Sequence, residues 1–152
     1  LATSSAASDV YKRQIIDQAD IDIDIGIYGF IPEEIIPQAE LRLSIYKEIS
    51  SIKENKNLEQ NKKDFIDRFG DVTSEITNLY ELSKLKNIAR KLNILGIKYR
   101  DENFSLKLAD DSRLIPPSSK IREIKVSAKD IKSDRLTFIM SKLESFLDKN
   151  EM

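Results

Sequence analysis

Three aspartates at alternate positions form the pattern nearest to a metal site in this chain of 152 residues. Asp20, Asp22 and Asp24 alternate with isoleucines, which is typical of a β-strand with one polar face and one apolar face. Side chains two residues apart on a strand point the same way but stand about 6–7 Å apart along it. No histidine and no further acidic cluster completes a coordination shell. The spacing therefore favours a solvated strand face over a metal site.

A neighbouring acid and base, Asp67 and Arg68, invite a catalytic or phosphate-binding interpretation. They stand just before Phe69 and Gly70, at the expected end of a helix where glycine suits a left-handed C-cap. A carboxylate and a guanidinium at such a place can tie the helix end to a neighbouring element through charge-assisted hydrogen bonds. We therefore expect a structural role for this pair.

The remaining equipment for catalysis is missing from the sequence. There is no His and no Cys, which removes the commonest general base, the commonest zinc ligands and a thiolate nucleophile. None of the four glycines belongs to a phosphate-binding loop followed by Lys and Ser or Thr. We therefore predict that this chain has no catalytic residues and binds no metal or cofactor by itself.

Net charge and hydropathy indicate in which cellular environment the protein works. A net charge of -1 gives no overall field that would attract nucleic acid or a membrane. No apolar run reaches the 18 or so residues that a membrane span needs, and no signal peptide is visible. We expect a cytoplasmic protein without membrane contact.

Apolar periodicity predicts the elements that position these residues. Helical spacing covers residues 38–53, 57–69, 74–92 and 134–149, and short alternating segments cover residues 20–25, 94–99, 104–108 and 121–126. The predicted fold class is α+β: a single domain with an N-terminal strand, an extended proline segment, three helices, a small antiparallel sheet and a closing C-terminal helix. The third helix has a broad apolar face that suits burial between other elements.

The proline segment runs from Phe30 to Pro37. Pro32 and Pro37 each push the preceding isoleucine toward extended geometry, so we expect an extended connection anchored by Phe30, Ile31, Ile35 and Ile36 on the core. Pro37 suits the first turn of the following helix, where its missing N–H is not needed.

Residues 1–14 read differently from the rest. LATSSAASDVYKRQ is small and polar without periodicity, and it resembles translated adapter sequence. We expect a non-native or disordered leader at 1–14, a fragment of a longer protein, and a folded domain over 15–152.

Three ordered pieces resemble one known family. They are Phe30–Pro37 with its two Ile-Pro steps, a helix from Leu41 with Arg42, Tyr46 and Lys47, and the end Asp67-Arg68-Phe69-Gly70; a helix with Asn78-Leu79 that closes in Lys91-Leu92-Asn93-Ile94 follows. This order is similar to the C-terminal (TRCF) domain of the bacterial transcription-repair coupling factor, the Mfd family. The resemblance covers roughly residues 20 to 100. Thr73 stands where the family usually has Pro, and Asn93 where it has Gly; both residues suit helix ends.

The resemblance implies a function. The family's whole protein is an ATP-dependent DNA translocase that displaces stalled RNA polymerase and recruits the UvrA excision-repair protein. ATP and Mg²⁺ belong to its motor domains, through which the parent meets DNA. The C-terminal domain acts as an autoinhibitory clamp on an N-terminal UvrB-like module and hides the UvrA-binding surface. The motif residues that we carry over as structural, or as part of an interface, are Pro32, Pro37, Arg42, Tyr46, Asp67, Arg68, Phe69 and Gly70.

A basic stretch supports a rival hypothesis. Residues 120–135 carry six Lys or Arg against three Asp or Glu, which suggests a small nucleic-acid-binding module. Aromatic residues that would stack on bases are missing from the stretch. A charge run of this kind is usually a solvated face, so we favour the protein-docking function.

Overall fold

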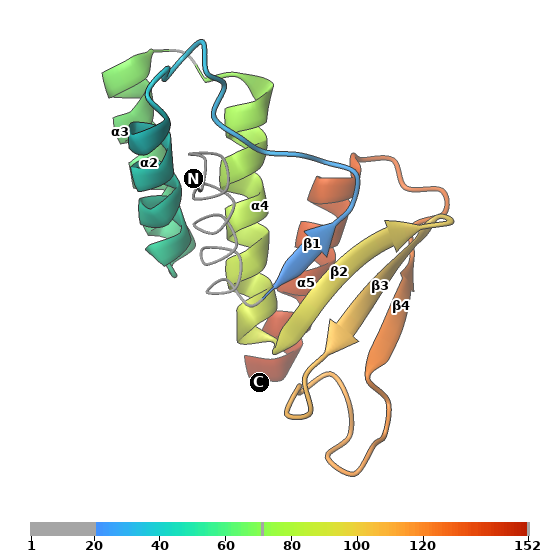
Figure 1. Cartoon of the computed structure of the whole chain (residues 1–152). Helices are drawn as coiled ribbons and strands as arrows, with labels where there is room; N and C mark the ends of the chain where they lie inside the picture. Colours follow the sequence, from blue (N-terminus) through green and yellow to red (C-terminus); the bar gives the residue numbers. More distant parts are fainter. Residues whose placement is uncertain (1–20, 71, 152) are drawn as a thin grey trace, which may run out of the picture.

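Four helices and four strands make up the part of the chain that the computed structural model describes, residues 21–70 and 72–151. They follow in the order β1 (Asp22–Asp24), α2 (Ala39–Ser51), α3 (Asn55–Phe69), α4 (Ser74–Lys91), β2 (Ile94–Arg100), β3 (Asn103–Leu108), β4 (Glu123–Ser127) and α5 (Arg135–Glu151) (Figure 1). The α+β class predicted from the sequence is confirmed. The expectations for residues 1–14 and for Asp20 lie outside the described residues.

The sheet has the order β1-β2-β3-β4. β2, β3 and β4 are antiparallel, as predicted, whereas β1 pairs with β2 in parallel and makes the sheet mixed. A parallel neighbour requires a crossover connection, and here the whole α2–α4 region provides it. Figure 1 shows α4 and α5 on one face of the sheet, and no described helix covers the other face, which we call the open face.

The open face of the sheet carries the aspartates that resembled a metal site. Asp22 lies opposite Gly96, and Asp24 lies opposite Lys98 on the neighbouring strand. Both aspartates are exposed, and among the described residues no group of three acidic side chains could hold a metal ion. Asp22 and Asp24 therefore lie on a solvated strand face, and Asp20 lies outside the described residues.

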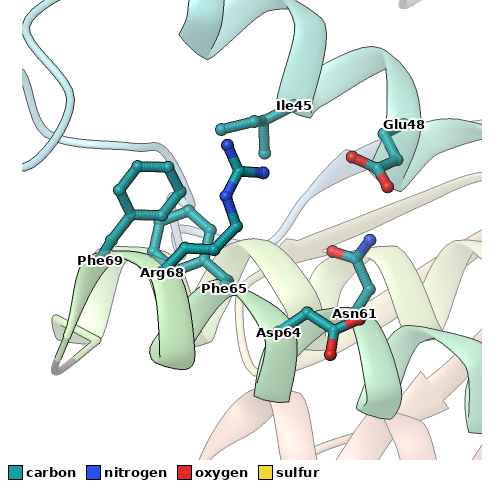
Figure 2. Close-up of a pocket in the computed structure, with 7 residues that line it drawn as sticks. All are labelled: Ile45, Glu48, Asn61, Asp64, Phe65, Arg68 and Phe69. Atoms are coloured by element: carbon teal, nitrogen blue, oxygen red, sulfur yellow. The ribbon is translucent and has the colours of Figure 1, made fainter.

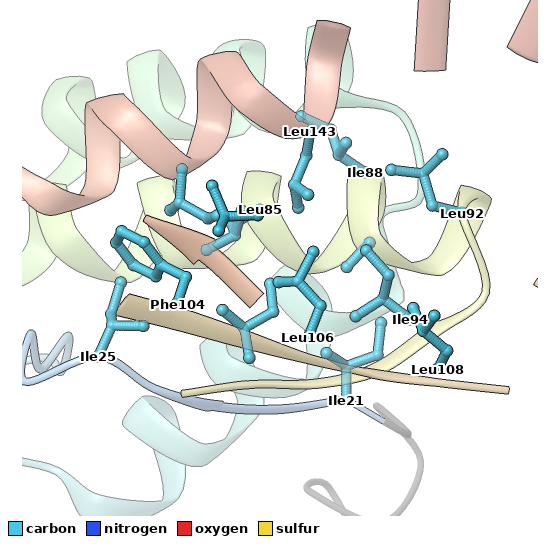
Figure 3. Packing of buried hydrophobic residues seen from close by; sticks show 14 of the residues in the cluster. Ile21, Ile25, Leu85, Ile88, Leu92, Ile94, Phe104, Leu106, Leu108 and Leu143 are labelled. Carbon is cyan, nitrogen blue, oxygen red and sulfur yellow. The ribbon is translucent and has the colours of Figure 1, made fainter. Parts of the chain in front are cut away.

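Helix α4 separates two hydrophobic cores. The sheet core lies between the strands and helices α4 and α5, and includes Leu85, Ile88, Phe104 and Leu143 (Figure 3). The helical core lies where α2, α3 and the proline segment meet the first half of α4, and it consists of Ile31, Ile36, Ile45, Ile49, Leu58, Phe65, Ile76 and Tyr80. Because α4 contributes to both, its apolar residues surround the helix, as its broad apolar face predicted.

Capping residues set the ends of α4. The Thr73 hydroxyl accepts a hydrogen bond from the Ile76 N–H at 3.3 Å, so threonine starts the helix as an N-cap. Asn93, just beyond the helix, has φ 55°, the left-handed conformation that asparagine tolerates better than most residues. Both expectations from the sequence are confirmed.

The segment that leaves β1 crosses directly over α4. A Cβ atom on Gly29 would lie 2.3 Å from the backbone nitrogen of Leu79, and the Phe30 N–H donates to the Glu75 carbonyl at 3.2 Å. The amide of Asn78 donates to the Tyr28 carbonyl at 3.3 Å. Gly29 allows this close approach, because only a residue without a side chain fits between the segment and α4.

We predict that Gly29→Ala destabilises the fold by about 3 kcal/mol, because the added methyl group must displace the backbone of α4. Chemical denaturation of the purified variants measures the change. The matched control is Gly96→Ala, where the new Cβ would meet the Asp22 carbonyl at 3.4 Å, an ordinary contact. Equal stability of the Gly29 and Gly96 variants would contradict the close packing.

Candidate functional site

The first half of the family-like motif converges at the junction between the proline segment and α2. The Nη1 atom of Arg42 donates to the carbonyls of Ile36 and Pro37, at 2.7 and 3.0 Å. The Tyr46 hydroxyl accepts the Ile31 N–H at 2.7 Å. A proline segment has no strand partner for its peptide groups, so these two side chains satisfy backbone atoms that would otherwise lack partners.

The proline segment differs from the extended connection that we predicted. The N–H groups of Ile35 and Ile36 both donate to the Pro32 carbonyl, at 3.1 and 3.2 Å, so the segment turns after Pro32. Pro37 lies one residue before the N-cap Gln38, outside the first turn of α2 where we expected it. The turn brings the carbonyls of residues 36 and 37 together, and Arg42 binds them.

Of the four anchors expected in this segment, one is misplaced. Ile31 and Ile36 are buried in the helical core and Ile35 packs against it. Phe30, in contrast, is exposed. Its neighbour Gly29 faces α4, and successive side chains of an extended segment point in opposite directions, so Phe30 must point away.

The second half of the motif forms the end of α3. The Phe69 ring packs on Phe65, with ring centroids 4.8 Å apart. Gly70 has φ 88° and ψ -151°, a region that glycine alone enters without strain, and its N–H donates to Ile66. A glycine therefore ends this helix, as predicted. Its backbone conformation, however, differs from that of the left-handed C-cap that we expected.

The tie expected from Asp67 and Arg68 is absent. Both residues are exposed, and between described residues neither forms a hydrogen bond or an ion pair. The Arg68 guanidinium lies over the Phe69 ring of its own helix, 4.9 Å from the ring centroid. The prediction of a structural tie is wrong, because α3 ends in Gly70 and in aromatic packing without using the charged pair.

A groove of about 220 Å³ lies between α2 and α3, and Arg68 is one of the residues that line it (Figure 2). Its apolar residues are Ile45, Phe65 and Phe69, and its polar residues are Glu48, Asn61, Asp64 and Arg68. Tyr80 donates a hydrogen bond to the Asn61 side-chain oxygen at 2.6 Å. Burial, reinforced by the charges of Glu48 and Asp64, raises the pKa of Tyr80 far above its ordinary value, so the phenol stays neutral. The groove thus combines apolar surface with carboxylate, amide and guanidinium groups.

Sequence reasoning missed the residue that fastens α2 and α3 to α4. The Asn87 amide is buried, and it donates to the Ile52 carbonyl and the Asn55 side-chain oxygen, each at 3.0 Å. Arg90 donates to the Asn87 oxygen at 2.9 Å. An asparagine on an otherwise apolar helix face was the only available signal, and the spacing does not name its partners.

Two cations of the basic stretch at residues 120–135 already bind other groups of the protein. Arg122 donates to the Asp110 carboxylate at 2.6 Å, and Arg135 donates to the Ile25 carbonyl at 3.2 Å while lying over the Tyr99 ring. Phe138, the aromatic nearest the stretch, packs on Phe104 inside the sheet core. The stretch therefore offers neither its full charge nor an aromatic platform to nucleic acid.

No helix among the described residues is long and apolar enough to cross a membrane.

Comparisons with known proteins agree on one family. A family profile described as TRCF domain matches residues 25–119. The transcription-repair-coupling factor of Rickettsia conorii is 30% identical over 128 residues, which are 84% of this chain and 11% of that protein. The corresponding factor of Escherichia coli K12 is 28% identical over 95 residues, 62% of this chain and 8% of that protein. This chain thus spans about a tenth of the length of such relatives.

A solved structure shows the same fold. It is described as the crystal structure of the C-terminal domain of transcription-repair coupling factor, with a TM-score of 0.70 and 20% sequence identity. The match covers 84% of this chain and 92% of the other.

We predict that Tyr46→Phe lowers the free energy of unfolding by about 1–2 kcal/mol, because the Ile31 N–H loses its acceptor in a partly buried place. Thermal or urea unfolding measures the loss. Tyr99→Phe is the matched control, since the Tyr99 hydroxyl has no hydrogen-bond partner among the described residues while its ring keeps its contact with Arg135. Equal losses for the two variants would show that the Tyr46 hydroxyl does not hold the proline segment.

Proposed function

Because the chain belongs to the TRCF domain family, we propose that it works as the autoinhibitory C-terminal clamp of a transcription-repair coupling factor. Its partner is the N-terminal UvrB-like module of the parent protein, and its effect is to cover the surface that UvrA binds. The parent is an ATP-dependent DNA translocase that displaces stalled RNA polymerase in the bacterial cytoplasm. ATP and Mg²⁺ act in its motor domains, and this domain is not a motor domain.

One observation carries the proposal. Of the polar residues in the motif, Arg42 and Tyr46 satisfy backbone groups of their own fold, whereas Asp67 and Arg68 satisfy none. Arg68 lines the groove between α2 and α3, whose apolar residues are Ile45, Phe65 and Phe69. Charged residues that a fold does not use, next to apolar surface, are what a protein partner can bind through hydrogen bonds at the rim and burial at the centre. We therefore place the docking site at the end of α3.

Clamping by this domain works as a population shift. In the closed state the domain covers the UvrB-like module; in the open state UvrA has access. A ligand that prefers the open state shifts the balance only by its difference in affinity for the two states. Contacts at exposed side chains suit such a switch, because releasing them leaves both hydrophobic cores intact.

The first test is a competition. We expect excess chain to reduce the capture of UvrA by the immobilised UvrB-like module. Bound chain covers the surface of the module that UvrA needs. The amount of captured UvrA should therefore fall as the concentration of the chain rises. Bovine serum albumin at equal concentration controls for non-specific loss. If the chain neither binds the module nor reduces UvrA capture, the clamp function is wrong.

The second test separates docking from folding. We predict that Asp67→Ala and Arg68→Ala unfold within about 0.5 kcal/mol of wild type, as exposed residues do, yet bind the module at least tenfold more weakly, about 1.4 kcal/mol. Calorimetric titration and thermal unfolding measure the two quantities. Lys56→Ala, an exposed residue at the other end of α3, should bind like wild type. Unaltered binding by both Asp67 and Arg68 variants would move the docking site elsewhere.

A further inference from the structure

Two large aromatic side chains lie exposed on the segment that crosses α4. Tyr28 is 72% exposed and Phe30 is 47% exposed, although a tyrosine or phenylalanine normally contributes much of its area to a core. Neither ring belongs to either hydrophobic core, and neither stacks on another aromatic ring among the described residues. The fold gains little from their size.

The exposure of these rings is fixed by the backbone. Gly29 faces the backbone of α4 so closely that no Cβ fits, and this forces the side chains on either side of it outward. The Tyr28 carbonyl is held by Asn78, and the Phe30 N–H is held by the Glu75 carbonyl. The two rings are therefore presented from a segment anchored at both positions. Such anchoring lowers the entropy cost of binding.

Acidic side chains stand next to the rings in the sequence and on the helix turn that the segment crosses. Glu33 and Glu34 are exposed in the turn that follows, and Glu75 stands in the first turn of α4. Hydrogen bonds from its own N–H and from Thr73 lower the pKa of Glu75, so it remains charged. Residues 26–41 and 72–83 contain no Lys or Arg. The next cation, Arg42, donates to the carbonyls of residues 36 and 37 and lies 3.8 Å from the Glu33 carboxylate, which stays largely exposed.

This combination selects the chemistry of a partner. Nucleic acid and anionic lipid carry negative charge, which the three carboxylates repel. The neighbouring guanidinium of Arg42 is already bound to two backbone carbonyls and to Glu33. A guanidinium, in contrast, can lie flat on an aromatic ring and at the same time donate to a carboxylate. Tyr, Phe and Arg are also enriched at protein interfaces.

We propose that Tyr28 and Phe30, together with Glu33, Glu34 and Glu75, form a second docking surface that takes arginine side chains from a positively charged protein surface. We call these five residues the aromatic–acidic surface. It lies on the crossing segment and the first turn of α4, apart in sequence from the pair at the end of α3. The preference of this surface for arginine does not depend on the proposed function. Only the identity of the partner does: under the proposed function, the UvrB-like module supplies the arginines.

The ligand chemistry is tested without that partner. Tetra-arginine amide is titrated into the full chain, with tetra-lysine and an oligothymidylate as comparisons, while NMR follows the aromatic and backbone signals. We expect shifts at Tyr28, Phe30 and Glu75 that saturate at lower concentrations of arginine than of lysine. The shifts should weaken when NaCl is raised to about 0.5 M, because part of the attraction is between charges. Shifts that centre on other acidic residues, or a stronger response to oligothymidylate, would overturn the proposal.

Variants connect the shifts to the rings. Tyr28→Ser with Phe30→Ser should abolish the preference for arginine over lysine and leave thermal unfolding nearly unchanged, because both side chains are exposed. Ile121→Ser is the matched control: Ile121 is an apolar residue with 52% exposure just before β4. If the control variant loses as much arginine binding as the double variant, the aromatic–acidic surface is not the site. Sedimentation of the chain alone must show a monomer, because self-association through the rings would mean that a second copy is the occupant.

The partner is tested last. We expect Tyr28→Ser with Phe30→Ser to weaken binding to the UvrB-like module by at least tenfold. If the wild-type chain fails to bind the module, the proposed function is wrong. The arginine titration still shows, independently, whether the aromatic–acidic surface binds arginine. If wild type binds and the double variant binds equally well, the module does not use the aromatic–acidic surface, and the assignment of its arginines to that module is wrong.

Discussion

The structure depends on helix α4, because both hydrophobic cores are built against it. Ile76 and Tyr80 complete the helical core, and Leu85, Ile88, Ala89 and Leu92 complete the sheet core. A helix surrounded by apolar contacts has little freedom to move relative to either side, since interiors are packed to the density of crystals. The crossing segment then fixes β1 to the same helix through Gly29, so the order of the sheet and the position of α2 both follow from α4.

The family-like motif separates into residues that hold the fold and residues that the fold leaves free. Arg42 and Tyr46 lie one helical turn apart and bind the backbone of the proline segment that precedes them. Prolines alone would leave that segment without a fixed path, since they restrict the backbone but provide no hydrogen-bond donors. Phe69 and Gly70 end α3. Asp67 and Arg68 do neither, and this difference within one short motif is the reason that we propose a docking role for them.

Most elements were predictable from the sequence because they follow from periodicity and caps. The helices, the hairpin of β2 and β3, and the conformations of Thr73 and Asn93 depend on neighbours a few residues away. What could not be predicted depends on contacts far apart in the chain. The parallel pairing of β1 with β2 joins residues more than seventy positions apart. The closeness of Gly29 to Leu79 and the partners of Asn87 are of the same kind. At the candidate site, Arg42 and Tyr46 were identified as residues, but their acceptors and donors were not, and the groove arises only when α2 and α3 pack together.

The distribution of exposed side chains fits a domain whose stability and docking are separable. Both proposed surfaces, the end of α3 and the aromatic–acidic surface, carry side chains that contribute little to either core. Each is nevertheless attached to a rigid part of the fold: Arg68 to the packed Phe69 ring, and Tyr28 and Phe30 to the backbone of α4. A clamp needs this combination, because contacts that also held the fold together could not be released without unfolding it. Under the proposed clamp function, rigid presentation with weak structural coupling would let the domain leave its partner as an intact body, so that opening would cost only the contacts themselves.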